Sequence, residues 1–218
     1  MESTDSMKEP TGSPSDVGIM IFGKEWSEKS HVGNVILGSY AFESQAPPNQ
    51  CVAAEGLVDD KHLTVVLTPN LISSQLKLRH LQRRMKECVS LCGPGPQAYI
   101  LVAQPQDLTE DDHKRVEMIL TSVLDQALER TLVVKFLPED EDEEEDEDGV
   151  GSSVDDYESD ALHRLIQVCG GGCYKLNLKH DEDHMQVEIL KKIENIVTSS
   201  SKHAELKEKE KKSLTSKL

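Results

Sequence analysis

A lysine and a serine that follow a glycine at a fixed spacing give this sequence a candidate phosphate site. The stretch Gly23-Lys24-Glu25-Trp26-Ser27-Glu28-Lys29-Ser30 nearly matches a phosphate-binding loop. In such a loop, successive backbone amides wrap an anion, a lysine reaches the β- and γ-phosphates, and a hydroxyl ligates Mg²⁺. Gly23, Lys29 and Ser30 have the required spacing, and we expect Ser30 to open a helix whose N-terminus faces the anion.

Residue 28 departs from this pattern, because a second glycine is expected where the backbone approaches the phosphates and the chain carries Glu28. A carboxylate held ~5 Å from a phosphate charge costs about 3 kcal/mol at an effective dielectric constant near 20. That cost equals some two decades of affinity. The alternative is an ordinary strand-to-helix turn that contains these residues by chance, and the stretch alone leaves both interpretations open.

The elements that must position this stretch follow an alternating pattern of strands and helices. Short runs of branched apolar residues predict buried strands at 17–22, 63–67, 98–103 and 131–137. Between them, apolar residues spaced by three and four predict helices, with Thr109 and Asp112 forming a capping box before a stripe that reaches Ala127. A last helix is expected over 185–197. This alternation predicts a three-layer α/β fold with a mostly parallel sheet and helices on both faces.

Composition and charge limit the classes of function. The net charge of −16 disfavours nucleic-acid binding, which needs basic residues to neutralise phosphates. No apolar run is long enough for a transmembrane segment, and no signal peptide is evident, so we expect a cytoplasmic protein. Its five cysteines are expected to be reduced thiols.

The chain is expected to contain one folded domain over residues 16–198. Residues 1–15 predict a disordered arm, and 199–218 a flexible lysine-rich tail. Residues 138–158 predict a disordered acidic insertion that contains the run EDEDEEEDED. The last three residues, Ser216-Lys217-Leu218, match a peroxisomal address, which gives an alternative location.

Three further stretches resemble one known family, the AIG1-type G domains of the IMAP GTPases. The segment CVSLCGPGPQAYILVAQPQDLTEDD (88–112) resembles the distinguishing segment of that family. The residues GNVILG (33–38) continue the loop as the family does, and LHRLIQVCGGGCYKLN (162–177) resembles its last helix, CG turn and asparagine segment. The resemblance covers about residues 17–197.

This resemblance implies a P-loop G domain that binds GTP or GDP with Mg²⁺ and associates with itself or related proteins through its G domains. It implies that Ser30 ligates the metal. The residues that it places at the nucleotide are Gly23, Lys24, Ser27, Lys29, Ser30, His31 and Asn177.

Several family features are missing, however. The D-T-P-G motif, whose aspartate supports the metal, reads Leu67-Thr68-Pro69-Asn70, and leucine cannot bind a metal-bound water. The first switch segment, 45–63, contains no threonine for Mg²⁺ and the γ-phosphate. The segment that should read the guanine base is Leu137-Pro138-Glu139-Asp140, in which Asp140 is the remaining candidate. We therefore predict slow or absent hydrolysis.

Two functions from different classes remain open. The chain is predicted to be a guanine-nucleotide-binding switch or assembly module with a weakened site. The alternative is a nucleotide-free pseudo-GTPase that serves as an interaction scaffold. A third hypothesis is that the acidic run Glu139–Asp148 captures basic partners.

Other candidate residues favour structural interpretations. Four cysteines, Cys88, Cys92, Cys169 and Cys173, could bind zinc, but their spacing is not typical of such a site. His180 and His184 are expected to face solvent in a loop. A basic patch on one helix is expected to be solvated, although it could dock an anionic partner; it comprises Lys77, Arg79, Arg83, Arg84 and Lys86.

Overall fold

The computed structural model describes residues 16–45, 49–93, 95–124, 126–137, 158–179 and 181–215. These residues form one six-stranded sheet of order β2-β3-β1-β4-β5-β6. All neighbouring strands run parallel except β2 and β3, which form an antiparallel hairpin. The prediction of a mostly parallel α/β sheet is therefore confirmed. The strands are β1 (Asp16–Gly23), β2 (Val52–Val58), β3 (Lys61–Leu67), β4 (Pro96–Ala103), β5 (Thr131–Leu137) and β6 (Cys173–Asn177).

The four predicted strands are the central ones, where both faces are covered. Continuous runs of branched residues are typical of such strands, because no position along them faces water. In β5, for example, every residue from Thr131 to Leu137 is buried. The sequence did not predict β2, an edge strand whose half-buried and exposed residues alternate. Its sequence, VAAEGLV, lacks the dense branched side chains of the central strands.

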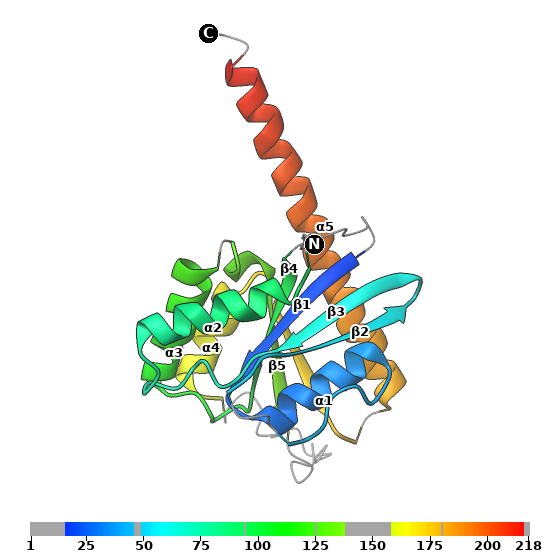
Figure 1. Ribbon diagram of the computed structural model, residues 1–218, viewed down its shortest axis with the longest axis vertical. Helices are drawn as coiled ribbons and strands as arrows, with labels where there is room; N and C mark the ends of the chain where they lie inside the picture. Colours follow the sequence, from blue (N-terminus) through cyan, green and yellow to red (C-terminus); the bar gives the residue numbers. More distant parts are fainter. Residues whose placement is uncertain are drawn as a thin grey trace, which may run out of the picture.

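Helices cover both faces of the sheet (Figure 1). The helices α1 (Trp26–Leu37) and α5 (Glu182–Thr215) pack on one face, where Val32, Ile36 and Ile189 belong to a single buried cluster. On the other face lie α2 (Leu78–Ser90), α3 (Glu110–Met118) and α4 (Asp160–Val168). A second cluster that includes Leu81, Val116 and Leu165 fills the space beneath them. The three predicted layers are thus present.

The capping box of α3 is confirmed, since Thr109 Oγ1 accepts a hydrogen bond from the amide of Asp112 while the Asp112 carboxylate accepts one from the amide of Thr109. The helix ends earlier than predicted. A π-helical turn follows at Ile119–Val123, and a 3₁₀ turn at Leu128–Arg130 leads into β5. Ile119, Leu120 and Ala127 of the predicted apolar stripe are buried all the same, but they lie beyond the end of α3.

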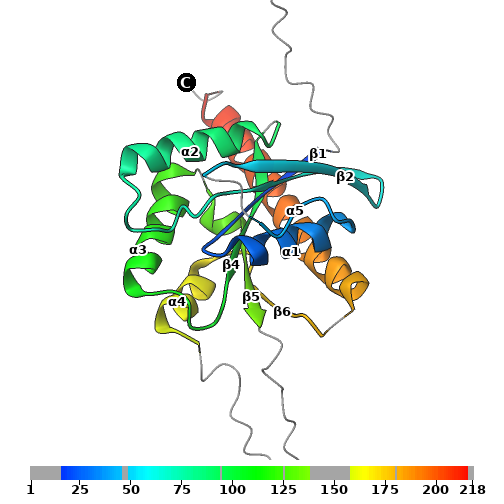
Figure 2. The same ribbon diagram turned by 60° about the horizontal axis from the view of Figure 1, so that its bottom comes forward.

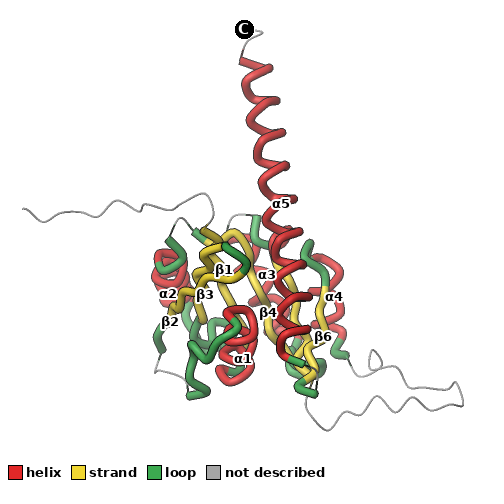
Figure 3. The backbone as a smooth tube through the Cα atoms, turned by 90° about the vertical axis from the view of Figure 1, so that its right-hand side faces the viewer, coloured by secondary structure: helices red, strands yellow, loops and turns green. Residues whose placement is uncertain are grey.

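The last helix is longer than predicted. It begins at Glu182 instead of 185 and continues to Thr215, through the residues that we expected to form a flexible tail. Residues 199–215 contain neither glycine nor proline and are rich in lysine and glutamate, which are good helix formers. In Figures 1 and 3, this part of α5 projects away from the sheet and its covering helices. His184 is exposed, as predicted, but it lies in the first turn of α5 and not in a loop.

The predicted arm (1–15), nearly all of the acidic insertion (138–157), His180 and the tripeptide 216–218 lie outside the described residues. Within the part that the structure describes, each helix is too short or too polar to cross a bilayer.

The prediction of reduced thiols is wrong for one pair, because Cys51 and Cys88 form a disulfide. Their 37-residue separation gives no sequence signal, and only the fold brings the two side chains together. The bond also removes Cys88 from any four-cysteine zinc site. Among the described residues, no group of three histidine, cysteine, aspartate or glutamate side chains could hold a metal ion.

Candidate functional site

The candidate phosphate site lies at the carboxyl edge of the sheet, where β1 ends and α1 begins. Figure 2 brings this edge forward. Gly23 is the last residue of β1, and a Cβ atom placed on it would lie 2.4 Å from the carbonyl oxygen of Val102 in β4. Glycine is therefore required here by the close approach of two strands.

The local structure after Gly23 differs from the prediction. Helix α1 begins at Trp26, so Ser30 is its fifth residue and does not open it. The residues that should wrap an anion form the first helical turn, and no residue from 24 to 31 has a positive φ. Between Gly23 and Gly33 the chain has no glycine to provide the backbone freedom of a phosphate loop. The indole of Trp26 instead fixes this turn by donating a hydrogen bond to the carbonyl oxygen of Glu43 at 2.9 Å.

Glu28 points into the protein. Its side chain is only 4% exposed, and its carboxylate accepts a hydrogen bond of 2.6 Å from Nε2 of Gln104, just after β4. Burial raises the pKa of Glu28 to about 7, and the nearby charges of Asp107 and Glu25 act in the same direction. The hydrogen bond from Gln104 and the charge of Lys29 oppose them. A carboxylate thus occupies the interior of the turn where a phosphate is bound in a working loop.

Lys29 and Ser30 are buried and bonded within the protein. The Lys29 ammonium group donates a hydrogen bond of 2.8 Å to the carbonyl oxygen of Gly23 and lies 5.9 Å from the centre of the Trp26 ring. Burial lowers the pKa of Lys29 to about 8, although Glu25 and Glu28 favour its charged form. The Ser30 hydroxyl donates to the carbonyl oxygen of Ser27 at 2.9 Å. The two residues that best matched the motif therefore already have partners.

Lys24 is also engaged in internal contacts. Its ammonium group lies 2.8 Å from Oδ2 of Asp112 and 3.6 Å from Oδ1 of Asp107, and it donates to the Asp107 carbonyl oxygen. Partial burial disfavours the charged form of Asp112, but the hydrogen bonds from Lys24 and Thr109 hold the pKa of that carboxyl group below its ordinary value. Ser27 is exposed on the first turn of α1. The capping box of α3 therefore also anchors the chain after β1.

The two remaining predicted residues lie at the same edge of the sheet. The His31 ring packs edge-on against Phe136 of β5, with 5.8 Å between the ring centres, and burial lowers the pKa of His31. Asn177 ends β6, three strands away from β1, and its side chain accepts a hydrogen bond from the amide of Lys179 at 2.9 Å. The structure thus places Asn177 apart from the start of α1 along the edge and brings the other six residues together.

The turn at the position of the metal-supporting motif is stabilised by hydrogen bonds within the turn. Leu67 is fully buried at the end of β3, and the side-chain oxygen of Asn70 accepts hydrogen bonds from the amides of Ile72 and Ser73. Two buried polar atoms at this edge, Nε2 of His31 and Oγ1 of Thr68, have no hydrogen-bond partner among the described residues. Buried polar atoms are usually paired, so these two atoms are exceptions in this part of the protein.

Sequence reasoning missed a buried ion pair beside the segment that should read the base. Lys135 of β5 donates a hydrogen bond to the carboxylate of Glu158, and both side chains are at most 5% exposed. Glu158 also lies 3.5 Å from the Nδ1 atom of His163. A lysine in the run TLVVKFL was the available signal, because a charged residue within a buried strand requires a partner.

These residues do not fit a magnesium ion. The Ser30 hydroxyl donates to a carbonyl oxygen of its own helix, and the position expected to carry the supporting carboxylate is the buried Leu67. Mg²⁺ requires near-octahedral oxygen ligands, and a leucine supplies none.

A cavity of about 550 Å³ lies elsewhere, between the β2–β3 hairpin, the start of β1 and α5. Its lining includes Val17, Leu63 and Leu190. Because Val17 and Leu63 lie near the amino-terminal ends of their parallel strands, this cavity is at the opposite edge of the sheet from Lys29.

Comparison with known proteins gives a family and a fold. The model of the AIG1 family matches residues 17–217. The chain is 29% identical over 187 residues to GTPase IMAP family member 8 of Mus musculus, which covers 84% of this chain and 26% of that protein. Immune-associated nucleotide-binding protein 1 of Arabidopsis thaliana is 22% identical over 162 residues, 70% of each chain. The chain therefore spans about a quarter of the first relative.

Among solved structures, Toc33 from Arabidopsis thaliana in complex with Mg²⁺ and GMPPNP superimposes with a TM-score of 0.63 at 13% identity, over 85% of each chain. A structure described as showing that dimerization is important for the GTPase activity of the chloroplast translocon components atToc33 and psToc159 has the same TM-score at 15% identity, over 84% of each chain. At these identities the likeness establishes the G-domain fold.

Proposed function

Because the chain belongs to the AIG1 family, we propose that it is a guanine-nucleotide-binding module whose affinity is weakened and whose hydrolysis is slow or absent, and that it acts as a switch or assembly module through association of its G domain. The observation that carries this proposal is the buried Glu28 carboxylate at the head of α1, beside Lys29 and Ser30.

The weakened affinity follows from what a nucleotide must displace. A phosphate at the head of α1 meets the Glu28 carboxylate and competes with the carbonyl oxygen of Gly23 for Lys29. At ~5 Å, the repulsion between a phosphate and an ionised Glu28 is about 3 kcal/mol, or some two decades in dissociation constant. Because the pKa of Glu28 is about 7, this full cost applies only at alkaline pH, where the group cannot escape it by taking up a proton. The ammonium group of Lys29, on the first turns of α1, still favours an anion. Because repulsion by Glu28 opposes attraction by Lys29, we expect weak nucleotide binding.

The slow or absent hydrolysis follows from the poor fit of these residues to a Mg²⁺ ion. Phosphoryl transfer relies on Mg²⁺ and on groups that stabilise charge on the transferred phosphate. Leu67 and the internally bonded Ser30 do not fit the ion, and the segment 45–63 provides no threonine. The remaining binding is therefore expected to be independent of Mg²⁺.

A solved structure with the same fold supports the proposal that this chain associates through its G domain. Dimerization is described as important for the GTPase activity of atToc33. Among the described residues of this chain, the six-stranded sheet is formed and buried apolar clusters join it to helices on both faces, which supports association of the same kind.

A titration of fluorescent GTP, GDP and ATP against the purified chain, with and without Mg²⁺, tests the proposal. We expect a dissociation constant for guanine nucleotides of about 100 μM to 1 mM, unchanged by Mg²⁺. Lys29→Ala should abolish the binding, whereas Lys86→Ala, at an exposed position on α2, should leave it unchanged. Phosphate release at an ordinary GTPase rate would refute the proposed slow or absent hydrolysis.

A second candidate function is a scaffold that binds no nucleotide. It is favoured by the internal contacts of Lys24 with Asp112 and of Lys29 with Gly23, which occupy both lysines of the motif. In that case none of the three nucleotides binds at millimolar concentration, and Lys29→Ala has no effect on binding to a protein partner.

The cytoplasmic location, with the peroxisome as the alternative, remains part of the proposal. Fusing residues 199–218 to a fluorescent protein, with deletion of Leu218 as the control, distinguishes the two. Punctate peroxisomal signal that disappears with Leu218 would support import.

A further inference from the structure

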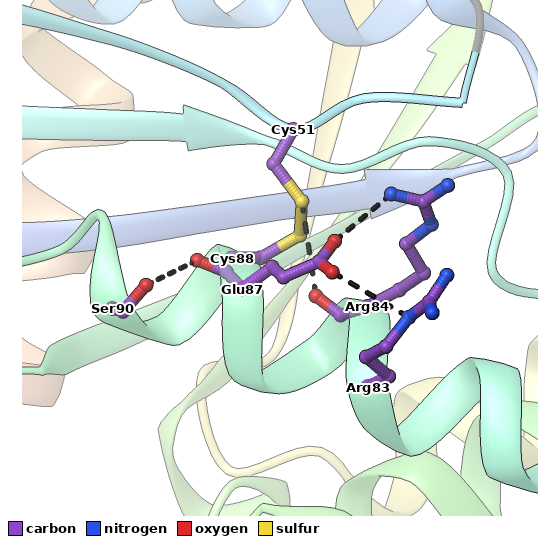
Figure 4. The surroundings of a disulfide bond; sticks show 6 residues. All are labelled: Cys51, Arg83, Arg84, Glu87, Cys88 and Ser90. Atoms are coloured by element: carbon purple, nitrogen blue, oxygen red, sulfur yellow. Dashed lines mark hydrogen bonds and ion pairs between the residues drawn. A yellow bond between two sulfur atoms is a disulfide. The ribbon is translucent and has the colours of Figure 1, made fainter.

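The disulfide between Cys51 and Cys88 joins two parts of the chain that lie far apart in sequence. Cys51 immediately precedes the edge strand β2, and Cys88 lies in the last turn of α2. The two Cα atoms are 5.5 Å apart. Figure 4 shows the bond between the strand segment and the helix, next to the side chains of Arg83, Arg84 and Glu87.

Helix α2 has few other anchors in the interior. Of its side chains only Leu81, Met85 and Cys88 are buried, and the outward face carries Arg83 and Lys86. The salt bridges of Arg83 and Arg84 with Glu87 stay within the helix and do not attach it to the sheet. The disulfide is thus a covalent link in addition to two buried apolar side chains.

The chain is held after α1, in residues 38–45, and before β2, in residues 49–51. Near α1, the Asn34 side chain accepts hydrogen bonds from the amides of Ala41 and Phe42, and Trp26 donates to Glu43. Before β2, the disulfide fixes Cys51 to α2. In the resemblance described above, this part of the chain runs into the first switch segment, and α2 follows the altered metal motif.

We propose that the Cys51–Cys88 disulfide is a redox-sensitive clamp that holds residues 49–51, just before β2, and helix α2 together when oxidised and lets them separate when reduced. The inference stands whether or not the chain binds a nucleotide. In a chain whose phosphate site is impaired, reduction of the disulfide would alter the contact between these two segments without a nucleotide.

The chemistry requires an external thiol as reductant. Cys88 is fully buried and Cys51 is half-buried, so a thiolate attacks the sulfur of Cys51, forms a mixed disulfide and releases Cys88 as a thiolate, which takes a proton from water. A second thiolate attacks the reductant sulfur, releasing the Cys51 thiolate and the oxidised reductant. Two electrons pass to the protein, and oxidised glutathione reverses the reaction.

The remaining thiols are poor competitors in this exchange. Burial raises the pKa of Cys92 and of Cys169 to about 12. Burial also raises the pKa of Cys173. Because the thiolate is the reactive form, the exchange is expected to be confined to Cys51 and Cys88.

The test compares the full chain after oxidised glutathione with the same chain after dithiothreitol. Titration of thiols in denaturant should give three free thiols in the first sample and five in the second, since two of the five cysteines form the bond. Hydrogen exchange should then speed up about tenfold or more in residues 49–51 and 78–90 on reduction, and much less in β1 and β4. The emission of Trp26, the single tryptophan, reports the chain after α1 through its bond to Glu43.

Two variants provide the controls. Cys51→Ser should show the reduced exchange pattern in both samples, and Cys173→Ser should respond as the wild type does. Five thiols after oxidised glutathione would overturn the proposal. So would exchange that changes equally in all strands and helices, because the bond would then be a general staple. If Cys51→Ser fails to fold, the wild-type comparison decides alone.

Discussion

Replacing Glu28 by glutamine tests whether a buried carboxylate strains this domain. Folding raises the pKa of Glu28 from 4.5 to about 7. The folded state therefore holds the proton more tightly than the unfolded state. Between pH 4.5 and 7, stability falls as the pH rises, because the folded chain must bury an ionised group. The full shift corresponds to about 3 kcal/mol, and allowing for screening by water and Lys29 we expect about 1–2 kcal/mol.

Glutamine keeps an acceptor for Gln104 but cannot ionise. Urea unfolding followed by circular dichroism should show Glu28→Gln to be more stable than wild type by about 1–2 kcal/mol at pH 8. At pH 4.5 the two proteins should be nearly equal. The corresponding shift of the melting temperature is about 3–6 °C at pH 8.

The control is Glu117→Gln, which changes an exposed carboxylate on α3, away from this turn. It should leave the pH dependence of the wild type in place. If wild type and Glu28→Gln lose stability in parallel from pH 4.5 to 8, the Glu28 carboxylate is solvated and the account of this turn is wrong.

The remaining predictions concern the supports of the site. Gly23→Ala should destabilise the chain by about 2 kcal/mol or more in urea, because the new Cβ would lie 2.4 Å from a backbone oxygen of Val102. Gly56→Ala should destabilise the chain less, because its new Cβ would meet only the movable Leu37 side chain, at 3.1 Å. Equal losses of stability in the two variants would show that the backbone contact at Gly23 is not the cause. Lys135→Met should lower the free energy of unfolding by about 3 kcal/mol, because the buried Glu158 carboxylate loses the ammonium group that it contacts. If the second change Glu158→Leu does not restore part of this loss, the ion pair does not explain it. Thr109→Ala should lower the melting temperature by about 2–4 °C through loss of the capping box, whereas Thr109→Ser should not.

The layers of the fold could be predicted from sequence because buried parallel strands have a strong signal. Four continuous runs of branched residues became the four central strands, and the Thr109–Asp112 box marked the start of α3 correctly. The edge strand β2 was missed because its small residues alternate with exposed ones, so apolar content alone does not distinguish it from a loop. The helical end of α5 was missed because its charge resembles that of a solvated tail.

The interior of the candidate site depended on tertiary contacts that spacing does not reveal. The motif placed Gly23, Lys29 and Ser30 correctly at the end of β1, but it did not show that α1 starts at Trp26. Glu28 bonds to Gln104, 76 residues away, so no local pattern indicates which way the carboxylate points. The disulfide joins residues on an edge strand and a helix, and the sequence offers only an odd number of cysteines.

The central claim is that Glu28 closes a phosphate site whose other residues remain. The most direct measurement is the affinity for fluorescent GTP of Glu28→Gly relative to wild type at about pH 8.5, where Glu28 is ionised, with circular dichroism to verify folding. We predict that Glu28→Gly binds about 10- to 100-fold more tightly, because the charge repulsion is removed and the glycine lets the backbone approach the phosphates. Equal or weaker binding by the folded variant would contradict the claim.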